Sequence, residues 1–173
     1  MSGKKWYDKN AVWTLFGVIV GALITFYASN FFYQKSESDK RRKLLRSAIN
    51  ECRFNLDPGV VHMFKDTTAS MDVGFPYEPL LNQSINELLS NLPSFQPIAD
   101  SLEINLIDIT WSAKDVIDQF NLRLNLRNLC LIINPSVAKQ MNPRAAEFYQ
   151  ERVEPTLRKF LDFVRKHEKE LAP

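Results

Sequence analysis

The chain has 173 residues, of which 45% are hydrophobic, 12% aromatic and 24% charged. This apolar content excludes an intrinsically disordered chain, and 5 glycines with 9 prolines exclude collagen-like and low-complexity proteins. With 2 cysteines and 2 histidines, neither a disulfide framework nor a thiolate or histidine-rich metal site is expected. The formal net charge of +2 is small, but the basic residues are unevenly distributed along the chain.

The first predicted element is a membrane-spanning helix over residues 11–33, preceded by a short extracytoplasmic tail of residues 1–10. No charged residue occurs from Asn10 to Gln34, and about 20 apolar residues span the hydrocarbon core of a bilayer. Amphipathic aromatic rings lie near both ends, as at headgroup level: Trp6, Tyr7, Trp13, Phe31, Phe32 and Tyr33. A cleavable signal peptide is disfavoured, because its apolar region is about 7–15 residues long and ends at small residues.

The orientation of this helix follows from its flanking basic residues. Three lysines precede it, whereas seven basic residues follow it: Lys35, Lys40, Arg41, Arg42, Lys43, Arg46 and Arg53. The positive-inside rule therefore predicts an inner (cell) membrane protein with its N-terminus outside and its C-terminal domain in the cytoplasm. Residues 34–43 form a basic juxtamembrane collar, which we expect to lie against anionic membrane lipids.

Small residues recur every four positions within the predicted membrane helix. They are Gly17, Gly21, Thr25 and Ser29. Such a stripe lets two helices approach closely and lets hydroxyl groups hydrogen bond across the interface, so we expect a homo-oligomer. The same stripe would also suit a water-filled pore, and the sequence does not distinguish these alternatives.

Residues 44–173 are predicted to form one all-α cytoplasmic domain of four to five helices. The membrane helix continues into the first of them, because neither proline nor glycine occurs between Gly21 and Pro58. Residues 59–81 show no sustained periodicity and are predicted to be an ordered loop. The next helix begins at the capping box Ser84–Glu87 and ends at Pro93.

The longest apolar pattern of the domain runs over residues 98–134 and predicts a helix. Short strands at residues 102–106 or 122–126 remain an alternative, because leucine and isoleucine alternate there with polar residues. Asn134-Pro135 is predicted to end this helix. Asn142-Pro143 is predicted to start the last one, which Pro155 kinks or restarts.

Charge and motifs restrict the function of the domain. Beyond Arg53 there are 12 basic and 16 acidic residues, a net charge of −4, so general DNA or RNA binding is not expected. The sequence contains no glycine-rich phosphate loop, no GxSxG, no HExxH and no CxxC. It therefore predicts a protein that is not an enzyme and has no cofactor, and any polyanion must bind at a specific local site.

The most suggestive polar residues lie in the stretch NLRLNLRN at residues 121–128. Arg123 and Arg127 share one helical face and could grip phosphates, whereas Asn125 and Asn128 could pair with adenine edges. In the predicted loop, His62 and Lys65 form a second small cluster. The alternative is an ordinary polar helix face whose charges form salt bridges within the protein.

In layout, the chain resembles the membrane-anchored ancillary effectors of type III CRISPR systems. It shares with them one N-terminal membrane helix, a basic collar with the sequence KRRK and a helical cytoplasmic domain. The resemblance implies an antiviral defence effector whose cytoplasmic domain binds a cyclic oligoadenylate, in particular cyclic tetra-adenylate. The alternative is a membrane-tethered protein-interaction module without ligand or enzymatic activity.

Overall fold

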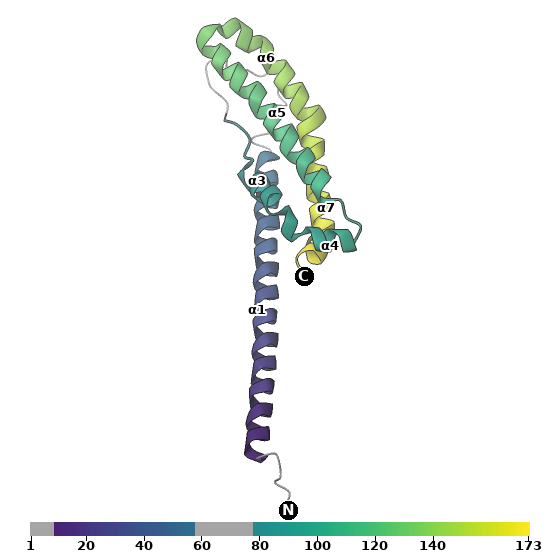
Figure 1. Cartoon of the computed structure of the whole chain (residues 1–173). Helices are drawn as coiled ribbons and strands as arrows, with labels where there is room; N and C mark the ends of the chain where they lie inside the picture. Colours follow the sequence, from purple (N-terminus) through teal and green to yellow (C-terminus); the bar gives the residue numbers. More distant parts are fainter. Residues whose placement is uncertain (1–8, 58–77) are drawn as a thin grey trace, which may run out of the picture. The chain divides into compact units, whose positions relative to one another are not determined.

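The computed structural model describes residues 9–57 and 78–173, with side chains from residue 12 onwards in the first range (Figure 1). These residues contain no strand, so the predicted all-α fold is confirmed. The chain divides into two compact units, Met1–Asp39 and Lys40–Pro173. His62 and Lys65, together with most of the loop predicted at residues 59–81, lie outside the described residues.

Helix α1 covers Lys9–Asn55 without interruption, which confirms the continuity predicted from the absence of proline and glycine between Gly21 and Pro58. From residue 12 to residue 36 every side chain except Val20 is exposed. This apolar stretch is long enough to cross a membrane. The last turns of α1 belong to the second unit, where its apolar side chains are buried in the core: Leu44, Leu45, Ala48, Ile49 and Cys52.

The next helices are α3 (Gln83–Ser90), η1 (Leu92–Ser94) and α4 (Gln96–Ser101). The predicted capping box is wrong, because α3 begins one residue earlier and Asn82 makes no side-chain cap. The buried carboxylate of Glu51 on α1 instead accepts hydrogen bonds from the backbone N–H groups of Ser84 (2.7 Å) and Ile85 (3.1 Å). A distant helix therefore satisfies the amides at the start of α3.

Helix α5 (Leu106–Ile133) includes residues 122–126 and therefore excludes a strand there. The single helix predicted over residues 98–134 is wrong at its beginning, because a connector separates α4 from α5. Asn105 caps α5 by accepting a hydrogen bond from the backbone N–H of Asp108 (3.1 Å). Glu103 in the connector has a φ of 53°, in the left-handed region that interrupts a helix.

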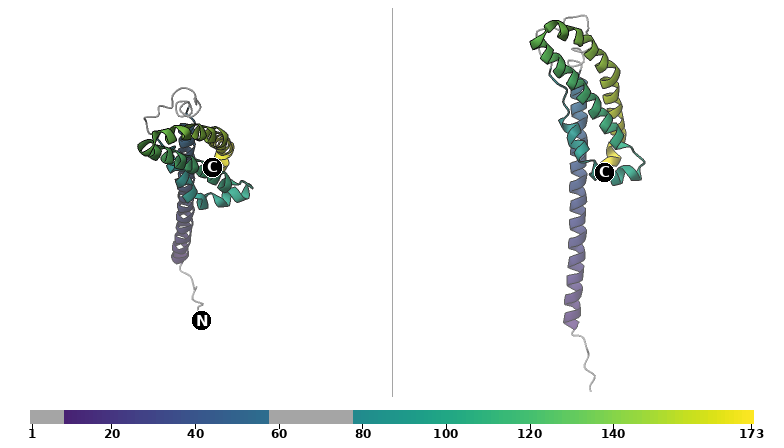
Figure 2. Two further views of the ribbon diagram at one scale, coloured as in Figure 1. Left: turned by 90° about the horizontal axis from the view of Figure 1, so that it is seen from above. Right: turned by 45° about the horizontal axis from the view of Figure 1, so that its top comes forward.

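Helix α6 (Pro135–Phe148), the π-helical turn η2 (Tyr149–Val153) and α7 (Glu154–Leu171) follow one another and pack against α5 (Figures 1 and 2). The helix start predicted at Asn142-Pro143 is wrong, because α6 starts at Pro135 and continues through Pro143. Asn134 is its N-cap and accepts from the backbone N–H of Ser136. Pro155, predicted to kink or restart the last helix, lies in the first turn of α7, directly after the π-helical turn η2.

The core of the second unit contains buried side chains from α1, α3, η1, α4, α5, α6, η2 and α7, and a polar contact inside it joins η2 to the end of α1. The rings of Phe120 and Tyr149 are buried, with centroids 5.4 Å apart. The Tyr149 hydroxyl donates to the backbone carbonyl of Asn55, the last residue of α1, over 2.6 Å. One of the terminal carbonyls of α1 thus finds its partner in η2.

We expect Tyr149→Phe to destabilise the domain by about 1–3 kcal/mol, because the buried Asn55 carbonyl loses its donor. Burial, and secondarily the negative charge of Glu154, raise the pKa of Tyr149 above its ordinary value. Below about pH 10 the Tyr149 hydroxyl is therefore protonated in both the folded and the unfolded protein. Above that pH only the unfolded tyrosine ionises, so the wild type loses stability that the variant does not.

Urea unfolding of the intact chain in detergent, followed by circular dichroism at pH 7 and pH 10.5, measures both effects. The exposed Tyr33 supplies the matched control Tyr33→Phe, which should leave the midpoint unchanged. An unchanged midpoint for Tyr149→Phe would contradict the buried hydrogen bond.

Candidate functional site

The structure assigns Arg127, a predicted phosphate contact, to the interior of the domain. Its side chain is only 1% exposed. Its Nε donates to Asn142 Oδ1 over 2.9 Å, and its Nη1 donates to the side-chain oxygen of Asn128 over 3.1 Å. Arg127 therefore joins α5 to α6 through Asn142, whereas its bond to Asn128 lies within α5, and the Arg127 guanidinium does not face solvent.

The other predicted ligand residues on α5 lie nearer the surface. Arg123 is half-buried, with its guanidinium 3.8 Å from the ring centroid of Phe148 and its Nη1 donating to the Gln119 carbonyl over 2.8 Å. Asn125 is exposed. Arg123 and Arg127 share a helical side, as the spacing predicts, but Arg127 is buried, whereas Asn125 is exposed and Arg123 and Asn128 are half-buried.

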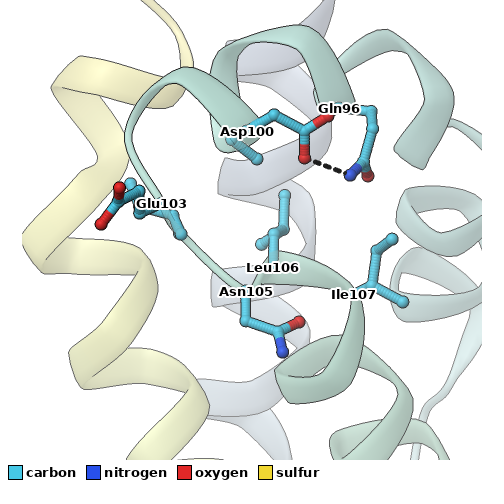
Figure 3. Close-up of a pocket in the computed structure, with 8 residues that line it drawn as sticks. Gln96, Asp100, Glu103, Asn105, Leu106 and Ile107 are labelled. Atoms are coloured by element: carbon cyan, nitrogen blue, oxygen red, sulfur yellow. Dashed lines mark hydrogen bonds between the residues drawn. The ribbon is translucent and has the colours of Figure 1, made fainter.

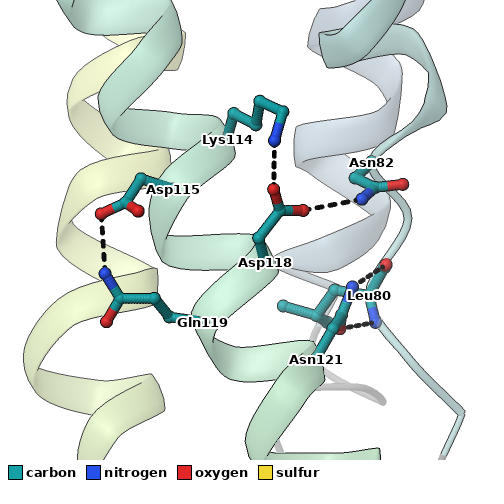
Figure 4. A network of polar contacts seen from close by, with 7 residues as sticks. All are labelled: Leu80, Asn82, Lys114, Asp115, Asp118, Gln119 and Asn121. Atoms are coloured by element: carbon teal, nitrogen blue, oxygen red, sulfur yellow. Dashed lines mark hydrogen bonds and ion pairs between the residues drawn. The ribbon is translucent and has the colours of Figure 1, made fainter.

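Amide side chains near this face hold the segment that precedes α3 (Figure 4). Asn121 exchanges two hydrogen bonds with the backbone of Leu80, of 2.7 and 2.8 Å. Asn55 does the same with the backbone of Leu81, over 2.7 and 2.9 Å. Asp118 accepts from Asn82 and forms an ion pair with Lys114. These polar residues are fully used in joining α1, α5 and the segment before α3.

The small-residue stripe on α1 is exposed throughout. A Cβ atom added to Gly17 or Gly21 would meet no atom within 4 Å. Thr25 donates its hydroxyl to the Gly21 carbonyl over 2.9 Å, within its own helix. Within one copy of the chain, these glycines therefore make no close packing contact that requires a small residue.

A pocket of about 340 Å³ lies between α4 and the start of α5 (Figure 3). Gln96 donates to Asp100 on its rim, whereas the Glu103 carboxylate points away from this pair. The described residues contain no group of three or more His, Cys, Asp or Glu side chains that could hold a metal ion. The residues that line the pocket include the carboxylates of Asp100 and Glu103 but no serine, threonine, cysteine or histidine.

A second pocket, of about 260 Å³, was not predicted from the sequence. It lies between the end of α1 and one side of α7 and is lined by Arg53, Leu56, Arg158, Leu161, Asp162 and Arg165. The seven-residue spacing of Arg158 and Arg165 was the available signal, because such residues lie on one side of a helix. The contribution of Arg53 comes from a distant part of the sequence, which no local pattern indicates.

Arg41 and Arg42 in the collar, and Arg46 just after it, contact other segments of the second unit. Arg42 donates to the carbonyl of Ala172 over 3.1 Å, and Arg46 forms a 3.2 Å ion pair with Glu168. Arg41 approaches the carbonyl of Ser94 at 3.5 Å. The collar therefore fastens α1 to the end of α7 and to η1, a role that its basic composition alone does not reveal.

No protein-family model matches the chain, and no curated protein or solved structure is significantly similar to it.

Proposed function

We propose that this protein is a single-pass membrane protein of the inner membrane whose helical domain lies in the cytoplasm and binds a small polyanion. Cyclic oligoadenylate is the first candidate ligand because of the resemblance to membrane-anchored CRISPR effectors. Binding perturbs the membrane through self-association of α1, which would make the protein an antiviral defence effector.

One observation carries this proposal: a single helix includes both the exposed apolar stretch and part of the buried core. Within α1, side chains up to residue 36 are exposed apart from Val20, whereas Leu45, Ala48 and Cys52 are completely buried in the domain. Exposed apolar residues in such number favour a lipid environment. A change in the packing around Leu45 and Cys52 acts directly on the helix that would cross the bilayer.

The orientation is tested with reporters fused after Pro173. We expect a fluorescent protein that folds only in the cytoplasm to be active there, and alkaline phosphatase, which needs the periplasm, to be inactive. The reason is the excess of basic residues after the apolar stretch. Active phosphatase, or a fusion that stays in the soluble fraction, would contradict the proposed topology or the membrane anchor respectively.

Titration of the intact chain in detergent with cyclic tetra-adenylate tests the ligand. Linear tetra-adenylate is the matched control, since it offers the same bases and phosphates without the closed ring. Saturable binding of the cyclic form supports the proposal. If neither form binds, cyclic oligoadenylate is excluded as the ligand.

A membrane-tethered protein-interaction module is the second candidate, and an apolar face of α5 favours it. Leu122, Leu126, Leu129 and Ile133 are spaced as one helical stripe, and each is between 47% and 80% exposed. Exposed apolar patches commonly mark interaction sites. Membrane localisation without binding of any tested anion would leave this candidate as the better one.

A further inference from the structure

We propose that the pocket between α1 and α7, here named the arginine pocket, binds the phosphate group of a ligand. Its members are Arg53, Leu56, Arg158, Leu161, Asp162 and Arg165. This inference rests on the proposed function in one respect: it assigns the polyanion of that function to this pocket. A phosphate site at these residues would stand even if cyclic oligoadenylate were not the natural ligand.

The position of the arginines favours a shared ligand. Arg53 lies in the last turn of α1, and Arg158 and Arg165 lie two turns apart on α7. Leu161, between them in sequence, is buried in the core, and Leu56 packs against it. Three guanidinium groups therefore surround a pocket with an apolar base that belongs to the folded core.

The hydrogen-bonding capacity of these arginines is largely unused. Among the described residues, the guanidinium groups of Arg53 and Arg165 have no hydrogen-bond or ion-pair partner, and both arginines are exposed. Arg158 donates through Nε and Nη2 to Glu154, at 3.1 and 2.8 Å, which fixes its position and leaves Nη1 available. Guanidinium groups bind phosphate oxygens in a bidentate manner, so the arginine pocket offers several such donors.

The charge balance also favours an anion. Three arginines and a single acidic residue, Asp162, line the pocket. Glu154, which pairs with Arg158, reduces the excess of positive charge but does not line the pocket. An anion bound between Arg53 and Arg165 would reduce the repulsion between the arginines and make charge-assisted hydrogen bonds.

The volume limits the ligand class. At about 260 Å³ the arginine pocket is smaller than the pockets of about 300–1,000 Å³ that enclose drug-sized molecules. It therefore suits one or two phosphate groups, with the remainder of the ligand outside the pocket. A nucleotide phosphate and a phospholipid headgroup share this chemistry.

The test uses the intact chain in a maltoside detergent, which contains no phosphate, with calorimetry at low salt. Pyrophosphate is the first probe. Cyclic tetra-adenylate and short-chain phosphatidic acid then distinguish a nucleotide phosphate from a phospholipid headgroup. We expect Arg53→Gln and Arg165→Gln each to weaken pyrophosphate binding about 10-fold or more. Arg144→Gln, which removes an exposed arginine on α6 outside the pocket, should change it less than about twofold.

A gain of affinity provides a test that misfolding cannot imitate. Asp162→Asn removes the one carboxylate that lines the pocket, so pyrophosphate should bind about fivefold more tightly. The helical circular dichroism of every variant checks that it is folded. Absence of pyrophosphate binding, or binding that is insensitive to Arg53→Gln, Arg165→Gln and Asp162→Asn, would overturn the inference.

The outcomes separate this inference from the proposed function. Pyrophosphate binding that depends on the arginines, without binding of cyclic tetra-adenylate, supports the arginine pocket and excludes the proposed ligand. Cyclic tetra-adenylate binding that the variants do not alter supports the proposed function and rejects this pocket as its site.

Discussion

Arg127→Ala is expected to lower the free energy of unfolding by about 2–4 kcal/mol. The substitution removes a 1% exposed side chain and leaves a void between α5 and α6. It also removes the donors that the side-chain oxygens of Asn142 and Asn128 accept from. Urea unfolding of the intact chain in detergent, followed by circular dichroism, measures the loss.

Two further variants separate the causes of this effect. Arg127→Met keeps much of the apolar stem and should recover part of the stability, because it fills most of the void. Arg123→Ala removes an arginine one turn away that is only half-buried, and it should cost about 1 kcal/mol or less. If Arg127→Ala is as stable as the wild type, the Arg127 guanidinium is not buried in the native protein, and Arg127 again becomes a candidate ligand contact.

Self-association of α1 is expected to weaken about 10-fold or more when Gly17 or Gly21 is replaced by isoleucine. A branched side chain keeps the backbones of two helices apart. Because an added Cβ meets no atom within 4 Å in one copy, the substitution should not disturb the isolated chain. Crosslinking of the intact protein in membranes, over a range of protein densities, measures the change.

The matched control is Leu23→Ile, which places the same side chain on another side of α1, where Leu23 is exposed. It should leave crosslinking unchanged. Equal crosslinking of the wild type, Gly17→Ile and Gly21→Ile would mean that the copies associate through another surface, such as the apolar face of α5.

The helices with strong local signals could be predicted from the sequence. The continuation of α1 beyond the apolar stretch follows from the absence of proline and glycine between Gly21 and Pro58, and Pro155 lies in the first turn of α7. The break between α4 and α5 was not predicted from the sequence. Leu102 and Leu106 have helical spacing, whereas Leu102, Ile104 and Leu106 alternate as in a strand, so neither pattern indicated a connector. The left-handed φ of Glu103 has no sequence signature, since glycine is the residue expected there.

The remaining errors come from contacts between distant parts of the chain. Asn134-Pro135 and Asn142-Pro143 are identical signals, yet only the first begins a helix, since Arg127 binds the side chain of Asn142 in the interior. Glu51 caps α3 from 33 residues away, and the arginine pocket depends on Arg53 meeting α7. Periodicity reports which face of a helix is apolar, but it does not report which helix will cover that face.

Arg42 in the collar and Arg46 just after it can act at two separate times, first during membrane insertion and later during folding. Arg42 and Arg46 pair with Ala172 and Glu168, which follow them by 130 and 122 residues. At about 5–20 residues per second, these partners are synthesised several seconds after the collar has left the ribosome. If α1 inserts as proposed, the bare charges first hold the collar on the cytoplasmic side, and only afterwards do the guanidinium groups complete the fold. Lysine at positions 42 and 46 would keep the positive charge that holds the helix end on the cytoplasmic side, but it would weaken the later bonds to Ala172 and Glu168. The same two residues can therefore serve insertion first and folding afterwards.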